Sequence, residues 1–219
     1  MYKTVVFDLD GTLLDTLDDL WGSVNAALTA FSLPKRTREE VRSFVGNGIK
    51  NLIDRAIGDS THPQAADVLA EFKRHYAEHC ADETKAYEGI LPLLRTLKEK
   101  GVKTAVLSNK ADFATKALAK RYFDGLLCEA AGENEAAGIR KKPAPDALFA
   151  IMERLGAESS TTVYVGDSEV DIQTANNAGV DCISVLWGFK DERFLRENGA
   201  KILIDDPAEI VRLCGLENA

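Results

Sequence analysis

The sequence has no run of apolar residues close to the roughly 20 that a membrane-spanning helix requires, so we expect no membrane partner. It also lacks an excess of basic residues. The 27 Lys and Arg stand against 35 Asp and Glu, and the resulting net charge of −8 argues against nucleic acid as a partner. The first residues lead directly into a strand-like segment, without the basic and apolar regions of a signal peptide, and we expect a cytoplasmic protein.

The chain also lacks a Cys-x-x-Cys pair. Its four cysteines lie far apart, at Cys80, Cys128, Cys182 and Cys214. This spacing does not fit a zinc site or a disulfide framework. We therefore expect reduced thiols.

Five short segments rich in Val, Ile, Leu and Tyr have the apolar character of buried parallel strands: Thr4–Leu9, Lys103–Ser108, Thr162–Gly166, Asp181–Leu186 and Lys201–Ile204. Helical patterns separate most of them, at Leu91–Lys100, Asp146–Leu155 and Val170–Ala178. Strands that alternate with helices predict an α/β fold with a doubly wound parallel sheet.

The segment 15–86 breaks this alternation, because it has helical patterns and no convincing strand. The patterns cover Leu17–Phe31, a stretch opened by Thr37-Arg38-Glu39-Glu40, and Ala65–Cys80. Thr37 and Glu40 have the spacing of a capping box, which marks a helix start. We predict an all-helical domain at 15–86, inserted into a core formed by 1–14 and 87–219. An insertion directly after candidate reactive carboxylates is suited to a lid.

Polar residues follow three of the predicted strands, where ligands gather in open α/β sheets. The first strand ends in Asp8-Leu9-Asp10-Gly11-Thr12, the second in Ser108 and Asn109, and the third in Gly166-Asp167-Ser168-Glu169-Val170-Asp171. Between the last two lies Lys141-Lys142-Pro143-Ala144-Pro145. Since side chains alternate along a strand, Asp8 and Asp10 project to the same side. Each motif alone fits a turn or a helix cap, but their occurrence in this order indicates a phosphoryl-transfer site.

Each of these residues meets a need of that chemistry. Asp8 is the expected nucleophile, which forms an aspartyl-phosphate, and Mg²⁺ would offset the repulsion between carboxylate and phosphate. Asp10 could protonate the leaving oxygen and then activate water. Asp167 is an expected metal ligand, and Asp171 could either reach the metal or hold the lysine. Lys142 supplies positive charge to the phosphate, a role that Lys141 fits sterically nearly as well.

Taken together, these motifs resemble the four motifs of the haloacid dehalogenase (HAD) superfamily, over essentially the whole chain. The resemblance implies a Rossmann-like core with a helical cap, Mg²⁺ dependence and an aspartyl-phosphate intermediate. It also implies a phosphate site made by Ser108, Asn109 and Lys142, and a metal held by Asp8, the Asp10 carbonyl and Asp167. Dehalogenases of this superfamily lack the second aspartate, so Asp10 points to phosphoryl transfer.

Within the superfamily the chain is most similar to phosphoglycolate phosphatases. The similar segments are Phe44-Val45-Gly46-Asn47-Gly48, Tyr87-x-Gly89 and Trp187-Gly188-Phe189. Main-chain N–H groups of the turn Gly46, Asn47 and Gly48 could bind a small carboxylate, although the turn could equally join two helices without a ligand. Because pyrophosphatases and sugar-phosphate phosphatases share such features, 2-phosphoglycolate is the leading substrate and these are alternatives.

Two other functions compete with a phosphatase. A phosphosugar mutase similar to β-phosphoglucomutase uses the same core but returns the phosphoryl group to the sugar. A response-regulator receiver accepts phosphate without turnover, but it needs neither Asp10 nor an inserted domain. We expect a small phosphorylated metabolite as the partner, and a monomer or a homodimer.

Overall fold

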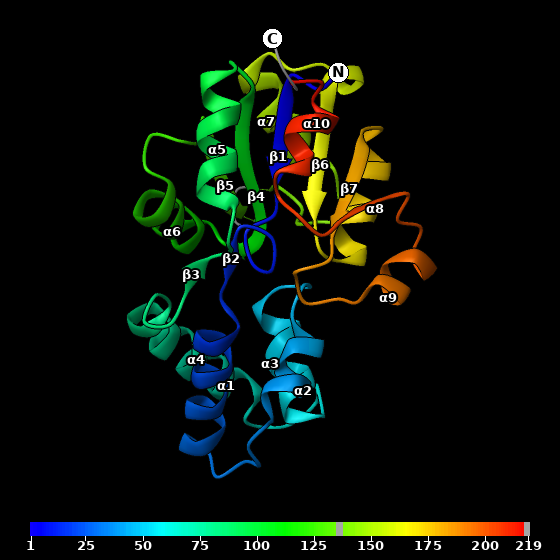
Figure 1. Ribbon diagram of the computed structural model, residues 1–219. Coiled ribbons are helices and arrows are strands. Elements are labelled where there is room, and N and C mark those ends of the chain that lie inside the picture. Colours follow the sequence, from blue (N-terminus) through cyan, green and yellow to red (C-terminus); the bar gives the residue numbers. More distant parts are fainter. Residues whose placement is uncertain (135–137, 217–219) are drawn as a thin grey trace. The chain divides into compact units, whose positions relative to one another are not determined.

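The computed structural model describes residues 1–134 and 138–216, and the chain divides into two compact units (Figure 1). The core unit consists of Met1–Leu14 and Ala86–Ala219, and the inserted unit is Asp15–Lys85. The second boundary lies one residue before the one expected from the sequence.

The core unit contains a six-stranded sheet in the order β5-β4-β1-β6-β7-β8. These strands are β5 (Glu129–Glu133), β4 (Lys103–Ala111), β1 (Thr4–Phe7), β6 (Thr162–Gly166), β7 (Asp181–Val185) and β8 (Ile202–Ile204). Every adjacent pair is parallel. Counted along the core, the order is 3-2-1-4-5-6, that of a Rossmann-like sheet. The predicted fold class is therefore confirmed.

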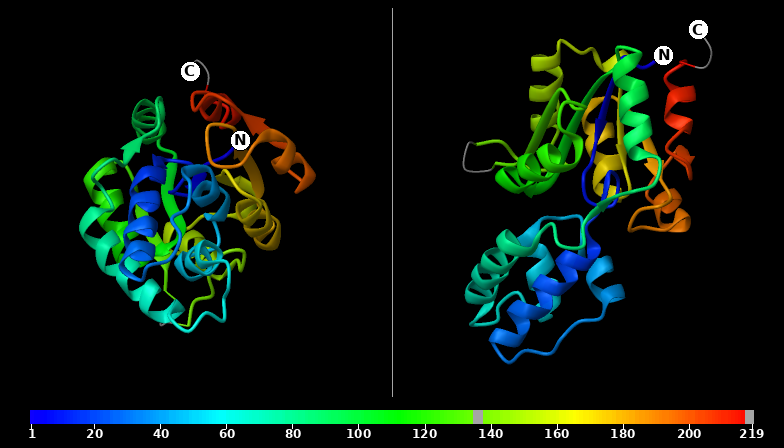
Figure 2. Two further views of the ribbon diagram at one scale, coloured as in Figure 1. Left: turned by 90° about the horizontal axis from the view of Figure 1, so that it is seen from below. Right: turned by 60° about the vertical axis from the view of Figure 1, so that its left-hand side comes forward.

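Helices cover both faces of this sheet (Figure 2). On one face α7 (Asp146–Leu155) and α8 (Glu169–Ala178) pack on Val6, Leu107 and Tyr164 in a buried apolar cluster. On the other face, α5 (Ile90–Glu99) contacts both β4 and α10 (Glu209–Leu213). The remaining core helices are α6 (Asp112–Phe123), the short α9 (Glu192–Glu197) and the 3-10 turn η2 (Ser159–Thr161). Since apolar layers lie on both sides, the middle strands are buried along their length, which explains their continuous apolar sequence.

The inserted unit consists of four helices, α1 (Leu17–Ala30), α2 (Arg38–Phe44), α3 (Ile49–Ile57) and α4 (Ala65–His79). The predicted capping box opens α2: Glu40 N–H donates to Thr37 Oγ1 at 3.2 Å and Thr37 N–H donates to the Glu40 carboxylate at 2.7 Å. The chain enters the unit through β2 (Leu14–Asp15) and leaves it through β3 (Lys85–Ala86), and these two strands pair with each other.

No disulfide bond involves any of the four cysteines, all of which lie among the described residues, as expected from their spacing. Among the helices of the described residues, none has both the length and the apolar character that crossing a membrane requires.

Candidate active site

The site is built at the carboxyl ends of three adjacent strands. Phe7, the last residue of β1, pairs with Val106 of β4 on one side and with Val165 of β6 on the other. Asp8 follows at once, and its N–H donates to the Val165 carbonyl at 2.8 Å. The parallel register therefore brings the residues that follow β1, β4 and β6 to one edge of the sheet.

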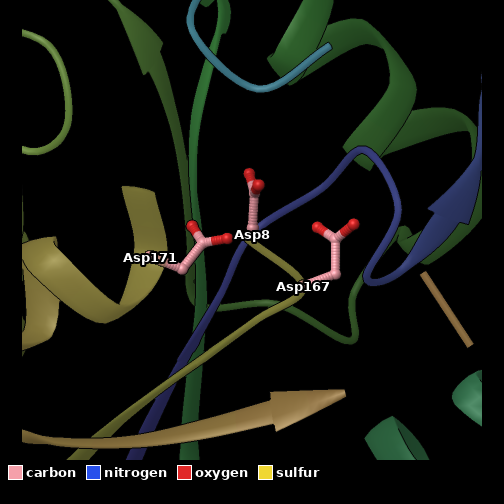
Figure 3. Close-up of side chains that lie close together, drawn as sticks. All are labelled: Asp8, Asp167 and Asp171. Carbon is pink, nitrogen blue, oxygen red and sulfur yellow. The ribbon is translucent and has the colours of Figure 1, made fainter. Parts of the chain in front are cut away.

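Three buried carboxylates meet at this edge (Figure 3). Asp8, Asp167 and Asp171 each present an oxygen atom, and these three atoms lie within 4.8 Å of one another. Asp8 comes from the end of β1, Asp167 follows β6 and Asp171 lies in the first turn of α8. These are three of the residues that the sequence selected, and the fold brings them together.

Lys142 is the positive charge of this cluster, and Lys141 is not in that position. Only 2% of the Lys142 side chain is exposed, and its Nζ lies 3.0 Å from Asp8 Oδ1 and 2.7 Å from Asp171 Oδ1. It also donates to Tyr164 Oη at 3.1 Å, while that hydroxyl donates to the Leu107 carbonyl. An ammonium group has three N–H donors, so these three contacts use all of them.

Asp171 has the contacts of a residue that holds Lys142. Its Oδ1 accepts from Lys142, and its Oδ2 accepts from the Ser168 N–H at 3.0 Å and the Ser168 hydroxyl at 2.7 Å. The same bonds to Ser168 cap α8. With both oxygens already engaged, Asp171 is better placed to orient the lysine than to bind a metal directly.

Asn109 forms two hydrogen bonds with the main chain of Lys142. Its amide nitrogen donates to the Lys142 carbonyl at 3.1 Å, and its amide oxygen accepts from the Lys142 N–H at 2.9 Å. The segment continues through a cis peptide bond into Pro143. These bonds of the Asn109 side chain fix the main chain of the lysine, and the phosphate binding expected of Asn109 from the sequence stays a prediction.

Ser108 and Lys110 extend β4 beyond its pairing with β1. Ser108 is 3% exposed, and its hydroxyl accepts from the Lys110 N–H at 3.3 Å. Lys110 was not selected from the sequence. Its ammonium lies 2.8 and 2.9 Å from the two oxygens of Asp10, the second carboxylate of the first motif. A strand-end position two residues after Ser108 was the only signal that could have suggested it.

The segment Trp187-Gly188-Phe189 supports Asp167. Phe189 N–H donates to Asp167 Oδ2 at 2.6 Å, and Trp187 Nε1 donates to the Thr12 carbonyl at 3.0 Å in the loop after β1. Gly188 lies so close that a Cβ atom there would meet the Asp167 side chain and the Gly11 carbonyl. Only glycine therefore fits between these two parts of the site.

We predict that Gly188→Ala destabilises the protein by about 1–3 kcal/mol, because the added methyl group has no room. The control is Gly22→Ala within α1, where a Cβ would meet nothing within 4 Å. That change is expected to be neutral or to stabilise by about 0.5–1 kcal/mol. Thermal unfolding followed by circular dichroism compares the two, and equal melting temperatures would contradict the close packing of Gly188.

The electrostatics of the cluster follow from burial. Burial raises the pKa of Asp8 to about 7; Lys142 opposes this shift, and Asp171 and Asp10 add to it. Burial likewise raises the pKa of Asp167 well above its usual value, with Asp171 and Asp8 contributing. For Lys142, burial alone would lower the pKa, but Asp171 and Asp8 outweigh it and raise the pKa well above its usual value. The cluster therefore has more negative charge than its lysine neutralises.

The donor set fits a hard divalent cation. Asp8 and Asp167 supply carboxylate oxygens, the ligands that Mg²⁺ prefers. In the described contacts of Asp8, Oδ1 accepts from both the Leu9 N–H and Lys142 Nζ. Asp167 Oδ1 accepts a long hydrogen bond, at 3.4 Å, from the Thr12 hydroxyl. A bound cation would also offset the unbalanced negative charge.

The cap residues selected from the sequence lie in the inserted unit. Gly46, Asn47 and Gly48 join α2 to α3, and both glycines have positive φ, +121° and +83°. Gly48 is also the N-cap of α3, and Asn51 Nδ2 donates to the Asn47 carbonyl. These helix-joining roles account for the glycines, and contact with a substrate stays a prediction.

Comparison with known proteins agrees with this geometry. The model of the haloacid dehalogenase-like hydrolase family matches residues 5–185. A phosphoglycolate phosphatase of Pseudomonas syringae pv. syringae is 34% identical, over 97% of this chain and 79% of its own length. One of Haemophilus influenzae strain 86-028NP is also 34% identical, over 97% and 98% of the two chains.

A solved structure from Lactobacillus delbrueckii subsp. bulgaricus, provisionally assigned as a phosphoglycolate phosphatase, superposes with a TM-score of 0.92. It is 36% identical and covers 97% of this chain and 98% of its own. The family match, the relatives and the site geometry lead to the same assignment. The chain belongs to the haloacid dehalogenase-like hydrolases and is a phosphatase of that family.

Proposed function

We propose that this phosphatase hydrolyses 2-phosphoglycolate in a Mg²⁺-dependent reaction that passes through a phosphoryl group on Asp8. The observation that carries the mechanism is the position of Asp8. It lies at the end of the central strand, 3.0 Å from the buried Lys142 and beside Asp167. The substrate is supported by the two relatives named phosphoglycolate phosphatase.

In the first half-reaction, a carboxylate oxygen of Asp8 attacks phosphorus, and the bond from phosphorus to the ester oxygen breaks. Asp10 gives a proton to that oxygen, which becomes the hydroxyl group of the departing glycolate. Once phosphorylated, Asp8 has lost its charge and attracts Lys142 less, so the ammonium can donate to the phosphoryl oxygens instead. Bound Mg²⁺, held by Asp8 and Asp167, would neutralise charge on the phosphoryl group and orient it.

In the second half-reaction, Asp10 takes a proton from water as the water oxygen attacks phosphorus. The bond between phosphorus and the Asp8 oxygen breaks, inorganic phosphate leaves and the Asp8 carboxylate is restored. Throughout the cycle Asp171 and Asn109 hold Lys142 in place, one through the ammonium and the other through the main chain.

The remaining assignments follow from this function. We propose a cytoplasmic protein, a monomer or a homodimer, whose partner is a small phosphorylated metabolite. Ser108 donates a hydrogen bond to the phosphoryl group, and the turn Gly46–Gly48 of the inserted unit contacts the substrate.

Phosphate release from a panel of substrates tests the proposal. The panel contains 2-phosphoglycolate, glucose 1-phosphate and pyrophosphate, each with Mg²⁺ and with EDTA, and Asp8→Asn is the blank. We expect 2-phosphoglycolate to be hydrolysed with the highest kcat/KM, and the activity to disappear with EDTA and in Asp8→Asn.

Other results would replace parts of the proposal. A higher kcat/KM for another member of the panel would keep the mechanism and overturn the substrate. Conversion of glucose 1-phosphate to its 6-phosphate without phosphate release would identify a mutase. Stable phosphorylation without turnover would identify a phosphate-accepting module.

A further inference from the structure

Each of the two carboxylates of the first motif has its own buried lysine. Asp8 pairs with Lys142, as described above. Asp10 pairs with Lys110, whose Nζ lies 2.8 Å from one carboxylate oxygen and 2.9 Å from the other. The Lys110 side chain is 3% exposed and that of Asp10 is 14% exposed. Asp10 exchanges protons in the proposed reaction, but its partner Lys110 has no part in that reaction as derived so far.

The main chain of Lys110 is fixed on several sides. Its N–H donates to Ser108 Oγ at 3.3 Å, and its carbonyl accepts from Thr115 Oγ1 of α6 at 3.3 Å. Gly132 of β5 packs so closely against that carbonyl that a Cβ atom would collide with it. The main-chain atoms of Lys110 therefore have a fixed position, and its ammonium group points at the Asp10 carboxylate.

We propose that Lys110 is a positioning residue for Asp10: it holds both carboxylate oxygens and so fixes the group that exchanges protons with the leaving oxygen and with water. The proposal rests on the proposed function, in which Asp10 has that role. Burying an ammonium group is unfavourable unless it is paired, so the contact is kept while the side chains remain buried. Proton transfer depends on the distance and direction between the Asp10 carboxyl and the oxygen atom with which it exchanges a proton. An Asp10 side chain that samples several conformations would therefore transfer the proton more slowly.

A positioning role has a consequence that a purely structural ion pair lacks. If Lys110 acts only through Asp10, its removal matters only while Asp10 is present. A double-mutant cycle measures this dependence directly. The four proteins are the wild type, Lys110→Met, Asp10→Asn and the double variant, which removes both charges of the pair.

The cycle is measured with 2-phosphoglycolate and, independently of the natural substrate, with p-nitrophenyl phosphate. Lys110→Met is expected to lower kcat by about 10- to 100-fold, part of the range that general acid–base catalysis contributes, while KM changes by less than about threefold. In the Asp10→Asn background, the same lysine change is expected to alter kcat by less than about twofold. Lys110→Arg, which keeps the cation, is expected to recover part of the loss.

Lys116→Met is the matched control, because it removes a Lys–Asp pair with Asp112 on the surface of α6 and should leave kcat unchanged. Circular dichroism checks that each variant is folded. An equal loss of kcat in both backgrounds would overturn the proposal and assign Lys110 to direct contact with the substrate or to the fold. If the wild type released no phosphate from either compound, the proposed function would fail, and this inference with it.

Discussion

Replacing Asp8 with asparagine is expected to abolish phosphate release and to raise the melting temperature of the metal-free protein. The activity is lost because an uncharged amide cannot replace the carboxylate nucleophile. Stability increases because Asp8 is a buried charge: burial raises its pKa to about 7 from an ordinary value of 3.8, even with Lys142 beside it. The residue proposed as the nucleophile thus weakens the fold.

The stability gain depends on pH in a defined way. Below the ordinary pKa of 3.8, Asp8 is protonated in both the folded and the unfolded chain, and the substitution has little effect. Between that value and about pH 7 only the folded protein keeps the proton, so wild-type stability falls as pH rises. Above pH 7 the full difference is present, on the order of 4 kcal/mol.

Thermal unfolding in EDTA at pH 4 and pH 8 measures this effect. At roughly 2–4 °C per kcal/mol, Asp8→Asn is expected to melt roughly 10 °C above the wild type at pH 8, with a much smaller difference at pH 4. A variant that melts at or below the wild-type temperature at pH 8 would show that Lys142 compensates Asp8 fully.

Replacing Lys142 with methionine is expected to lower both activity and stability. The variant leaves Asp8 and Asp171 buried without their shared cation, and losing one partner of a buried ion pair costs about 3–5 kcal/mol. Phosphate release should fall by about 100- to 1,000-fold, the usual effect of removing one donor to a developing negative charge.

Lys141→Met provides a matched control for this experiment. Lys141 is the sequence neighbour of Lys142 and only half-buried, whereas the Lys142 side chain is 2% exposed. We expect Lys141→Met to keep the wild-type melting temperature and kcat. Phosphate-release assays and thermal unfolding of both variants separate the two lysines, and a similar loss in both would contradict the assignment of Lys142.

The sequence predicted five of the six strands of the sheet, including the edge strand β8, but missed β5 at the other edge. β1 and β6 consist of fully buried residues, so their apolar sequence is continuous. β5 reads Glu-Ala-Ala-Gly-Glu and is only half-buried for most of its length, because it lies at one edge of the sheet. A strand with one neighbour and small residues has no apolar pattern to detect. The helices α3, α6, α9 and α10 were also not predicted.

The candidate site was predictable where a residue type is unusual for its place. Carboxylates that interrupt or directly follow buried strands are such a signal, and the fold brings Asp8, Asp167 and Asp171 together. Lys110 gave no such signal, because a lysine at a strand end is normally exposed. Its partner Asp10 lies 100 residues away in the sequence, and only the sheet register joins them. Likewise, the spacing of Asn109 did not reveal that its amide binds the main chain of Lys142.

The paired strands β2 and β3 have a consequence for how the chain folds. The central strand β1 pairs with β4, although the whole inserted unit lies between them in the sequence. Closing a long flexible loop loses more entropy than closing a short one. Once the helices have formed and β2 has paired with β3, the two ends of the insertion are held next to each other. Pairing β1 with β4 then costs only the closure entropy of a short connection. Early folding of the insertion would therefore speed assembly of the sheet.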